Sequence, residues 1–227
     1  DVIVTLTGSG TSTAGTDYAS LSTITISTGN TSGTTTFNPT NDSIYEGSET
    51  AIIAITNVAG GSAQESGNQS ETITITDSLA APTVTLTTSA STVSEKASDL
   101  TLTATLNRST YETVTVTLSP SGTSTAGTDY ASLSSITISA GNTTGTTAFN
   151  PTDDTLFENS ETAIIAITGV SGGDATESGT QSETITITDN ETAPTVTLST
   201  SASSVAENGS DITLTATLSG ATSEDVT

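Results

Sequence analysis

The sequence contains no cysteine, methionine, tryptophan or histidine. Without cysteine the chain has no disulfide bond, no thiolate nucleophile and no sulfur ligand for a metal. Without histidine it has no imidazole for metal binding or for general-base catalysis. Cys-His and Ser-His-Asp mechanisms are therefore excluded, and any metal site must be built from oxygen ligands.

Basic residues are almost as scarce. Lys96 and Arg108 stand against 25 acidic residues, so the net charge is −23 and the isoelectric point is about 4.1. Such a chain repels nucleic acid and anionic membranes, and we expect cations as its partners. No apolar run reaches the roughly 18 residues of a membrane-spanning helix, so we expect no membrane insertion within this sequence.

Aromatic residues make up 3% of the chain and hydrophobic residues 31%. Both values are low for a globular domain, and a disordered Ser/Thr-rich tract is the alternative that such a composition suggests. The sequence nevertheless repeats itself. The segment SGTSTAGTDYASLS begins at Ser9 and again at Ser121, 112 residues later, and ETAIIAIT, QSETITITD and APTVTL recur at the same interval. This period fits a whole domain rather than a solenoid repeat, and it favours an ordered array.

The Ala-Pro pairs at Ala81 and Ala193 mark the boundaries between units. They predict a first module at residues 1–80 that lacks its opening strands, a complete second module at 81–192, and a third segment at 193–227 that supplies opening strands only. We expect these modules to be joined end to end through short linkers, in an extended array.

The chain starts and stops at the same phase of the repeat, because Asp1-Val2 aligns with Thr113-Val114 and with Asp225-Val226. We interpret the sequence as a window on a longer repetitive chain, or as one subunit of a polymer. Neighbouring copies of the repeat would then complete the interrupted modules. In a polymer the Thr227 end would abut the Asp1 end of the next copy, and Glu207 would reach the acidic pole there.

Apolar residues alternate with threonine along the second module, as in half-buried β-strands. Clusters of Gly, Asn, Asp and Ser separate the segments, and none has a helical period. Seven short strands in about 110 residues indicate an antiparallel β-sandwich with an immunoglobulin-like architecture. The expected strands are 83–87, 100–106, 114–118, 136–138, 143–150, 163–167 and 185–187.

Acidic residues gather in the loops of each unit. Loops from alternate strand ends meet at one pole of a sandwich, where their carboxylates repel one another unless a cation lies between them. Ca²⁺ takes six to eight oxygen ligands and needs neither nitrogen nor sulfur. These loops therefore predict calcium binding. The alternative is that they are solvated acidic residues, which is common in turns.

Three motifs together resemble the Calx-beta domain: TAGTDY, PTDDTLFENSET from Pro151, and ETITITDN from Glu183. The resemblance extends over nearly the whole chain. It implies a seven-stranded sandwich with calcium bound at one pole. The implied ligands of the second module are Glu95, Asp129, Asp153, Asp154, Glu158 and Asp189; the matching positions are Asp17, Asp42, Glu46 and Asp77 in the first module and Glu207 in the third segment.

Some positions stay open between two interpretations. Glu161 is either a ligand or a loop brace, and Asp129 either a ligand or part of a turn that packs its tyrosine on the sheet. The first module has Asn41-Asp42 where the second has an Asp pair, and Asp77 is followed by Ser78 rather than by a longer acidic run. Fewer carboxylates predict fewer ions or weaker binding in the first module.

We expect a non-enzymatic structural repeat of an extracellular or cell-surface protein, with a bacterial source suggested by composition. Calcium would rigidify its modules within a filament. One alternative is the stalk or ligand-binding region of an adhesin, for cell or carbohydrate attachment. Another is a regulatory calcium sensor like that of sodium/calcium exchangers. Glycoside hydrolysis by Asp153 and Asp154 is disfavoured, because they are adjacent and no aromatic sugar platform accompanies them.

Overall fold

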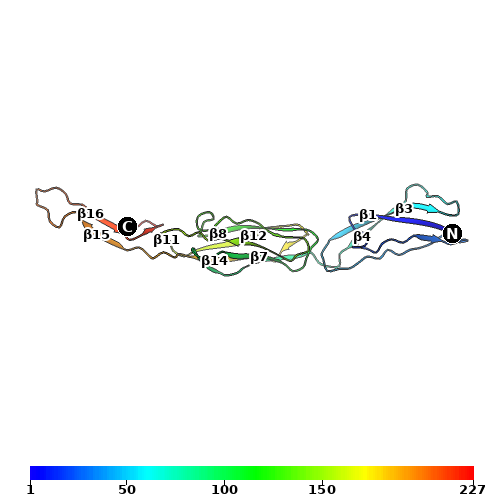
Figure 1. Cartoon of the computed structure of the whole chain (residues 1–227), viewed down its shortest axis with the longest axis horizontal. Coiled ribbons are helices and arrows are strands. Elements are labelled where there is room, and N and C mark those ends of the chain that lie inside the picture. The colour runs from blue at the N-terminus through cyan, green and yellow to red at the C-terminus, as the bar shows by residue number, and fades with distance from the viewer.

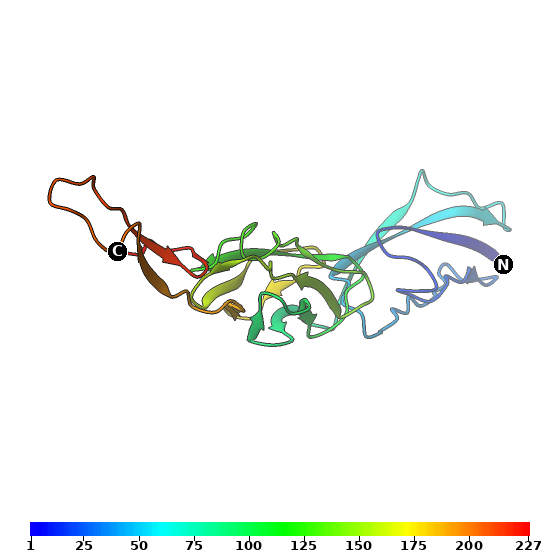
Figure 2. The ribbon, with the colours of Figure 1, turned by 60° about the vertical axis from the view of Figure 1, so that its left-hand side comes forward.

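The computed structural model describes all of residues 1–227, and every regular element in it is a β-strand. The chain forms a long, narrow array in which the two termini lie at opposite ends (Figure 1). The first module, the second module and the third segment follow one another along the long axis, as Figure 2 also shows from a second direction. No helix that could cross a membrane is present.

The second module is a two-layer sandwich. One sheet has four strands in the order β10-β7-β5-β13, and the other has five in the order β6-β14-β12-β8-β9. The strand bounds are β5 Thr83–Thr88, β6 Thr92–Ser94, β7 Leu100–Leu106, β8 Val114–Gly122, β9 Ile136–Ile138, β10 Thr144–Phe149, β11 Leu156–Phe157, β12 Glu161–Ser171, β13 Thr176–Glu177 and β14 Ser182–Thr188. The predicted all-β sandwich class is confirmed, and all seven predicted strands of this module are present.

Three short strands were not predicted, namely β6, β11 and β13. Each has two or three residues and pairs in parallel with a neighbour that is distant in sequence. Period-two alternation cannot be recognised over so few residues, so these contacts become visible only in three dimensions.

The core of the second module comes from the inward positions of the alternating strands. Eighteen buried side chains form one cluster between the two sheets. Val84 and Leu102 from one layer and Ile165 and Ile185 from the other are each 0% exposed. Burial of each such side chain stabilises the fold by about 1.5 to 3 kcal/mol. The thin, mainly aliphatic core is therefore adequate because both sheets contribute to it.

The repeated GTDY segment forms a turn and also contributes its tyrosine to the core. The N–H of Gly127 donates to the carbonyl of Tyr130 at 2.7 Å, and the Tyr130 ring is 1% exposed. It stacks on Phe149 with a centroid distance of 4.7 Å. Tyr18 and Phe37 repeat this stack in the first module at 4.8 Å. The tyrosine fixes the turn on the sheet, which in turn fixes the position of the aspartate before it.

The first module contains one sheet only, with four strands in the order β2-β1-β3-β4. These strands are β1 Val2–Gly10, β2 Ile24–Ile26, β3 Ser48–Ala59 and β4 Ser70–Thr76. In this order they correspond to β8, β9, β12 and β14 of the second module. Of its apolar side chains only Tyr18 and Ala51 are buried. The inner face of this sheet thus lacks the second layer that covers its counterpart.

A strand that the second module forms is missing from the first. Residues 144–149 make β10 and pair with β7, whereas the similar residues 32–37 form no strand. β7 is the only strand that pairs with β10. Because the first module has no counterpart of β7, residues 32–37 have no ladder to join.

The third segment is a hairpin of β15 Val196–Thr200 and β16 Leu214–Leu218, followed by the short strand β17 Ala221–Thr222. The hairpin corresponds to β5 and β7. Val196, Leu198 and Leu214 are 56%, 73% and 66% exposed, while their counterparts in the second module are at most 3% exposed. The same apolar pattern is therefore buried or exposed according to whether an opposing sheet is present.

The modules contact one another through a loop as well as through the linker. β11 lies parallel to β17, so that Leu156 pairs with Ala221 and Phe157 with Thr222. The corresponding pairing between the first and second modules is a parallel bridge between Tyr45 and Thr110. Both junctions therefore use the same loop of one module and the same loop of the next.

Candidate metal centre

In the first and second modules the acidic loop and the carboxylates grouped around it lie at the pole that faces the following module. The first fixed carboxylate belongs to the GTDY turn. Asp129 Oδ2 accepts a hydrogen bond from the N–H of Thr125 at 2.6 Å, and Asp17 Oδ2 accepts one from Thr13 at 2.5 Å. The remaining oxygen of each carboxylate is left for other partners at the pole.

The acidic loop of residues 151–161 is ordered by its own aspartates. Asp154 Oδ1 accepts the N–H of Leu156 at 2.7 Å, which is the local turn chemistry expected of aspartate. Asp189, at the end of β14, accepts the N–H of Glu158 through Oδ2, and that of Glu191 through Oδ1 at 2.6 Å. The loop is therefore tied to the end of the last strand of the sandwich.

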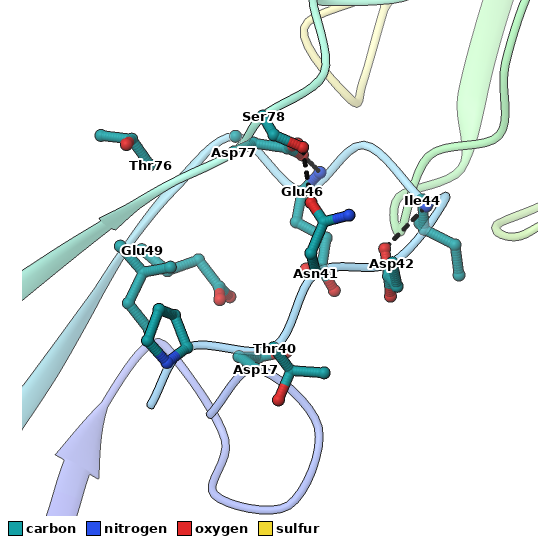
Figure 3. A pocket seen from close by; sticks show the side chains of 13 residues that line it. Asp17, Thr40, Asn41, Asp42, Ile44, Glu46, Glu49, Thr76, Asp77 and Ser78 are labelled. Carbon is teal, nitrogen blue, oxygen red and sulfur yellow. Dashed lines mark hydrogen bonds between the residues drawn. The ribbon is translucent and has the colours of Figure 1, made fainter. Parts of the chain in front are cut away.

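The first module repeats these bonds. Asp42 Oδ1 accepts the N–H of Ile44 at 2.8 Å, and Asp77 Oδ2 accepts the N–H of Glu46 at 2.6 Å. Figure 3 shows both bonds, with the side chains of Asp17, Glu46 and Glu49 around the same space. The backbone of this loop is thus shaped in the same way in both modules.

Two groups of carboxylates result in the second module. Asp129, Glu158 and Glu161 each place one oxygen within 4.8 Å of the others, and so do Glu95, Asp189 and Glu191. In the first module only the first group is present, as Asp17, Glu46 and Glu49. Each group places three negative charges close enough to share one cation.

Glu95 provides the clearest indication that a cation belongs there. Its side chain is only 6% exposed, and its Oε2 has no hydrogen-bond partner. Glu191 Oε2 is also buried without a partner. A buried carboxylate oxygen without a donor is costly, and no basic side chain forms an ion pair with this group. A bound cation would supply the missing partner.

The electrostatics of the pole point the same way. Burial, followed by repulsion from Asp189, raises the pKa of Glu95 to about 7. Burial and the neighbouring Asp129 likewise raise the pKa of Glu161 to about 7, and burial and Asp17 do the same for Glu49. In each case burial and the neighbouring aspartate make the charged form of the glutamate unfavourable in the cation-free protein.

In the first module these residues line a cavity of about 170 Å³. Thirteen residues surround it, and only two of them are hydrophobic. Asp17, Asp42, Glu46, Glu49 and Asp77 are among them. A cavity of this size and polarity suits a hydrated cation better than an organic ligand, which prefers a largely apolar lining.

Of the predicted ligands, the structure brings Asp129 together with Glu158, Glu95 with Asp189, and Asp17 with Glu46. Asp42 and Asp77 line the cavity. Burial is the main cause of the raised pKa of both Glu95 and Glu158, and the negative charge of Asp154 adds to it in each case. Glu207 lies in the exposed loop between β15 and β16, where no such group forms.

Asp153 makes a different contact. Its Oδ2 lies 3.9 Å from Lys96 Nζ, and both side chains are largely exposed, at 43% and 74%. It belongs to neither group of carboxylates. The structure therefore places Asp153 at the rim of the pole, paired with the only lysine of the chain.

Three members of these groups were not among the predicted ligands. From the sequence Glu161 is either a ligand or a loop brace, and its counterpart Glu49 is not among the predicted ligands. Their recurrence 112 residues apart, at the start of a strand next to the acidic loop, was the available signal. Glu191 had no such signal, because the corresponding residue of the first module is Leu79.

The model of the Calx-beta domain matches residues 1–79 and residues 77–191. No curated protein sequence matches the chain. Among solved structures, the apo form of the Calx CBD1 domain is similar with a TM-score of 0.42 and 19% identity, over 48% of this chain and 98% of that one.

Two further solved structures contain the tandem CBD12 unit. That of CALX1.2 gives a TM-score of 0.39 at 22% identity, over 44% of this chain and 41% of the other. The calcium binding domain CBD12 of CALX1.1 gives 0.39 at 15% identity, over 59% and 68%. The two matches of the domain model, which together span most of the chain, are the stronger finding.

Proposed function

The chain belongs to the Calx-beta family, and on this premise we propose that it is a non-enzymatic structural repeat whose modules are rigidified by Ca²⁺ at their acidic poles. The observation that carries the proposal is the buried, unpartnered Oε2 of Glu95 beside Asp189 and Glu191. A bound cation would both satisfy this oxygen and reduce the repulsion among the three carboxylates.

Calcium suits the oxygen atoms at this pole better than other common metals do. All candidate ligands are carboxylates, and Ca²⁺ accepts carboxylate, carbonyl and water oxygens in flexible geometry. Zinc and copper prefer nitrogen and sulfur ligands, which this chain cannot provide. Mg²⁺ requires a more rigid octahedral shell and retains its water, so it is the competing ion to test.

The two modules would hold different numbers of ions. Glu95, Asp189 and Glu191 would hold one ion in the second module, beside a second ion at Asp129, Glu158 and Glu161. The first module has only Asp17, Glu46 and Glu49: Leu79 replaces the last glutamate of the other group, and the position that matches Glu95 precedes Asp1. A calcium-saturated chain is therefore expected to bind more ions in the second module.

Rigidity would follow from where the acidic loop lies. Glu46 and Glu158 come directly after Tyr45 and Phe157, the residues that pair with the next module. An ion that fixes the loop backbone would also fix this pairing. The partner of each pole is the neighbouring copy of the repeat, in the same chain or in an adjoining subunit.

A filament at the cell surface is the setting that this arrangement suits best. An extended array of repeated modules, with charge concentrated at the poles, supports a stalk or fibre role, and extracellular calcium would keep the sites filled. We place the protein outside the cell, in a bacterium, on the basis of its composition. An adhesin stalk would use the same arrangement, with recognition provided by another part of the protein.

Calorimetry tests the proposal that bound Ca²⁺ stabilises the modules. Thermal unfolding is compared in calcium, in magnesium and after chelation; a ligand at a hundred times its dissociation constant stabilises by about 2.7 kcal/mol. We expect calcium to raise the melting temperature far more than magnesium. Superimposable curves in calcium and chelator would overturn the proposal.

Substitution of Glu95 by glutamine sharpens this test. Glu95→Gln removes one charge, so it should stabilise the chelated protein while weakening the response to calcium. Asp99→Asn is the matched control, since Asp99 is exposed and belongs to neither group. A Glu95→Gln variant that loses stability in chelator and keeps the full calcium response would show that Glu95 has a purely structural role.

A further inference from the structure

We propose that the junction between the first and second modules is held by a calcium-independent latch in which the hydroxyl of Tyr45 donates to the carboxylate of Asp174. The two atoms, Tyr45 Oη and Asp174 Oδ2, are 3.1 Å apart, and the residues are separated by 129 positions in the sequence. This contact involves none of the carboxylate groups of the proposed ion sites. It therefore goes beyond the calcium-dependent function.

Tyr45 bonds to the second module through its backbone as well as its side chain. Its N–H donates to the carbonyl of Ser109 at 2.9 Å, and its carbonyl accepts the N–H of Tyr111 at 3.2 Å. The backbone bonds form the parallel bridge between the two loops, and the phenol extends from this bridge to Asp174. One residue thus makes three hydrogen bonds across the junction.

Contacts within the second module fix the backbone turn that carries Asp174. This residue lies in a left-handed conformation, with φ of 49°, directly after Gly173. The N–H of Gly173 donates to Glu112 Oε2 at 2.8 Å. A Cβ at Gly173 would lie 2.4 Å from the Oγ1 of buried Thr110, so only glycine allows the turn to pack there.

The backbone of the first module also approaches Asp174, at Gly47. A Cβ built on Gly47 would lie 3.4 Å from Asp174 Oδ2, so the backbone two residues after Tyr45 also approaches this carboxylate. Asp174 therefore lies against the acidic loop of the first module. The phenol supplies the neutral donor that makes this approach favourable in an otherwise acidic region.

The copies of the repeat differ at the positions that form the latch. At the second junction the residue corresponding to Tyr45 is Phe157, which has no hydroxyl. Within the first module the position of Asp174 is taken by Ser62, which follows glycines that lie against Asp1 and Val2 and so belongs to neither junction. Ser62 has the same left-handed backbone, with φ of 53°. The backbone pairing recurs at both junctions, but the Tyr-Asp hydrogen bond belongs to the first junction alone. The latch therefore distinguishes one junction from the other.

Removal of calcium should affect the two junctions differently. At the second junction Phe157 has no hydroxyl to donate, so the backbone pairing of β11 with β17 and the acidic loop itself are the elements that hold it. At the first, the Tyr45 phenol is uncharged and remains bonded to Asp174 when the pole loses its ion. We expect the first junction to stay docked in chelator under conditions in which the second loosens.

Amide hydrogen exchange of Tyr45, measured in chelator on the full chain, tests the latch. Tyr45→Phe reproduces the residue that the repeat itself uses at position 157, so the fold should accept it. We expect exchange of this amide to accelerate about 3- to 10-fold, the effect of losing one hydrogen bond at a partly exposed site. The Ala51 amide, in β3, serves as the internal reference for unfolding of the first module.

The control is Ser134→Ala, which removes a hydroxyl that bonds to Thr147 within the second module and touches no residue of the latch. It should leave exchange at Tyr45 unchanged. Asp174→Ser removes the acceptor from the other side, in a module whose core is complete, and should match Tyr45→Phe. The double variant should exceed neither single variant.

The exchange rates of the Tyr45 amide in these variants decide whether the latch exists. Acceleration in both latch variants, without acceleration in the control and without change at Ala51, supports the proposal whatever the effect of calcium. Unchanged exchange in Tyr45→Phe or in Asp174→Ser, or equal acceleration in Ser134→Ala, overturns it. A loss of calcium response in the wild-type chain would contradict the proposed function and leave the latch intact.

Discussion

The backbone N–H of Glu158 donates a hydrogen bond to Asp189 Oδ2 across 31 positions of the sequence. This bond joins the acidic loop to the end of β14, and Glu46 and Asp77 repeat it in the first module at 2.6 Å. Asp189 therefore serves two purposes: it orders the loop, and it belongs to a carboxylate group with Glu95 and Glu191.

Replacement of Asp189 by alanine should weaken the second module in calcium. The substitution removes the acceptor for two backbone N–H groups and one carboxylate of the proposed site. Hydrogen bonds to a charged group contribute about 1.5 to 3 kcal/mol, so urea unfolding in saturating calcium should show a loss of this size. Asp99→Ala is the matched control, and a loss of the same size in the control would contradict the role of Asp189.

Stability of the calcium-free chain should fall as the pH rises. The pKa values of Glu95 and Glu161 are raised from 4.5 to about 7 in the folded state, chiefly by burial and then by neighbouring carboxylates. Between these values the folded state binds more protons than the unfolded state, so their contribution is complete below pH 4.5 and is lost through pH 7.

Urea unfolding of the metal-free protein, repeated at several pH values between 4.5 and about 7, measures this change in stability. Calcium affinity should change in the opposite direction and increase up to about pH 7, because the ion competes with protons for the same oxygens. The double variant Glu95→Gln, Glu161→Gln should flatten both profiles. Stability that rises with pH in the metal-free wild type would contradict the prediction.

The buried Tyr130 should be needed for the site as well as for the core. Tyr130→Ala removes a ring that is 1% exposed and stacked on Phe149, and should cost about 3 to 5 kcal/mol of the second module's stability. Because Asp129 is its neighbour, calcium affinity of that module should fall too. Tyr130→Phe keeps the ring and should retain affinity; an equal loss in this variant would disprove the packing argument.

Residues 32–37 should become a strand when a partner is provided. A chain extended before Asp1 by a copy of residues 82–112 would supply the counterpart of β7, the strand with which β10 pairs. The amides of residues 34–37 should then gain protection from hydrogen exchange. Extension by the same residues with Leu102 and Ala104 changed to aspartate is the control, and protection in this control would contradict the explanation.

The sandwich could be predicted from the sequence because the local pattern of most strands agrees with their burial in the fold. Strands such as 100–106 alternate strictly between apolar residues and threonine, so local pattern and tertiary burial agree. Residues 32–37 carry the same local pattern as β10 yet form no strand, because pairing depends on a partner distant in sequence.

The metal centre was predictable where the repeat copied it and less so elsewhere. Asp129 and Glu158 stand in loops that recur in both modules, so the repeat itself marks them as candidate ligands. Glu191 occurs in one copy only, and its proximity to Glu95 depends on the parallel pairing of β6 with β14, which no local pattern reveals. The outward position of Asp153 likewise follows from a contact with Lys96 that sequence spacing does not encode.

The parallel bridge between Tyr45 and Thr110 has a mechanical consequence for the array. A linker alone would act as a universal joint, but each module is attached to the next at two separate places, the linker and the bridge. Two points of attachment define a line, and rotation that keeps both intact is possible only about that line. The array should therefore behave as a flat ribbon that flexes in one plane and stays stiff in the other, rather than as an evenly flexible thread.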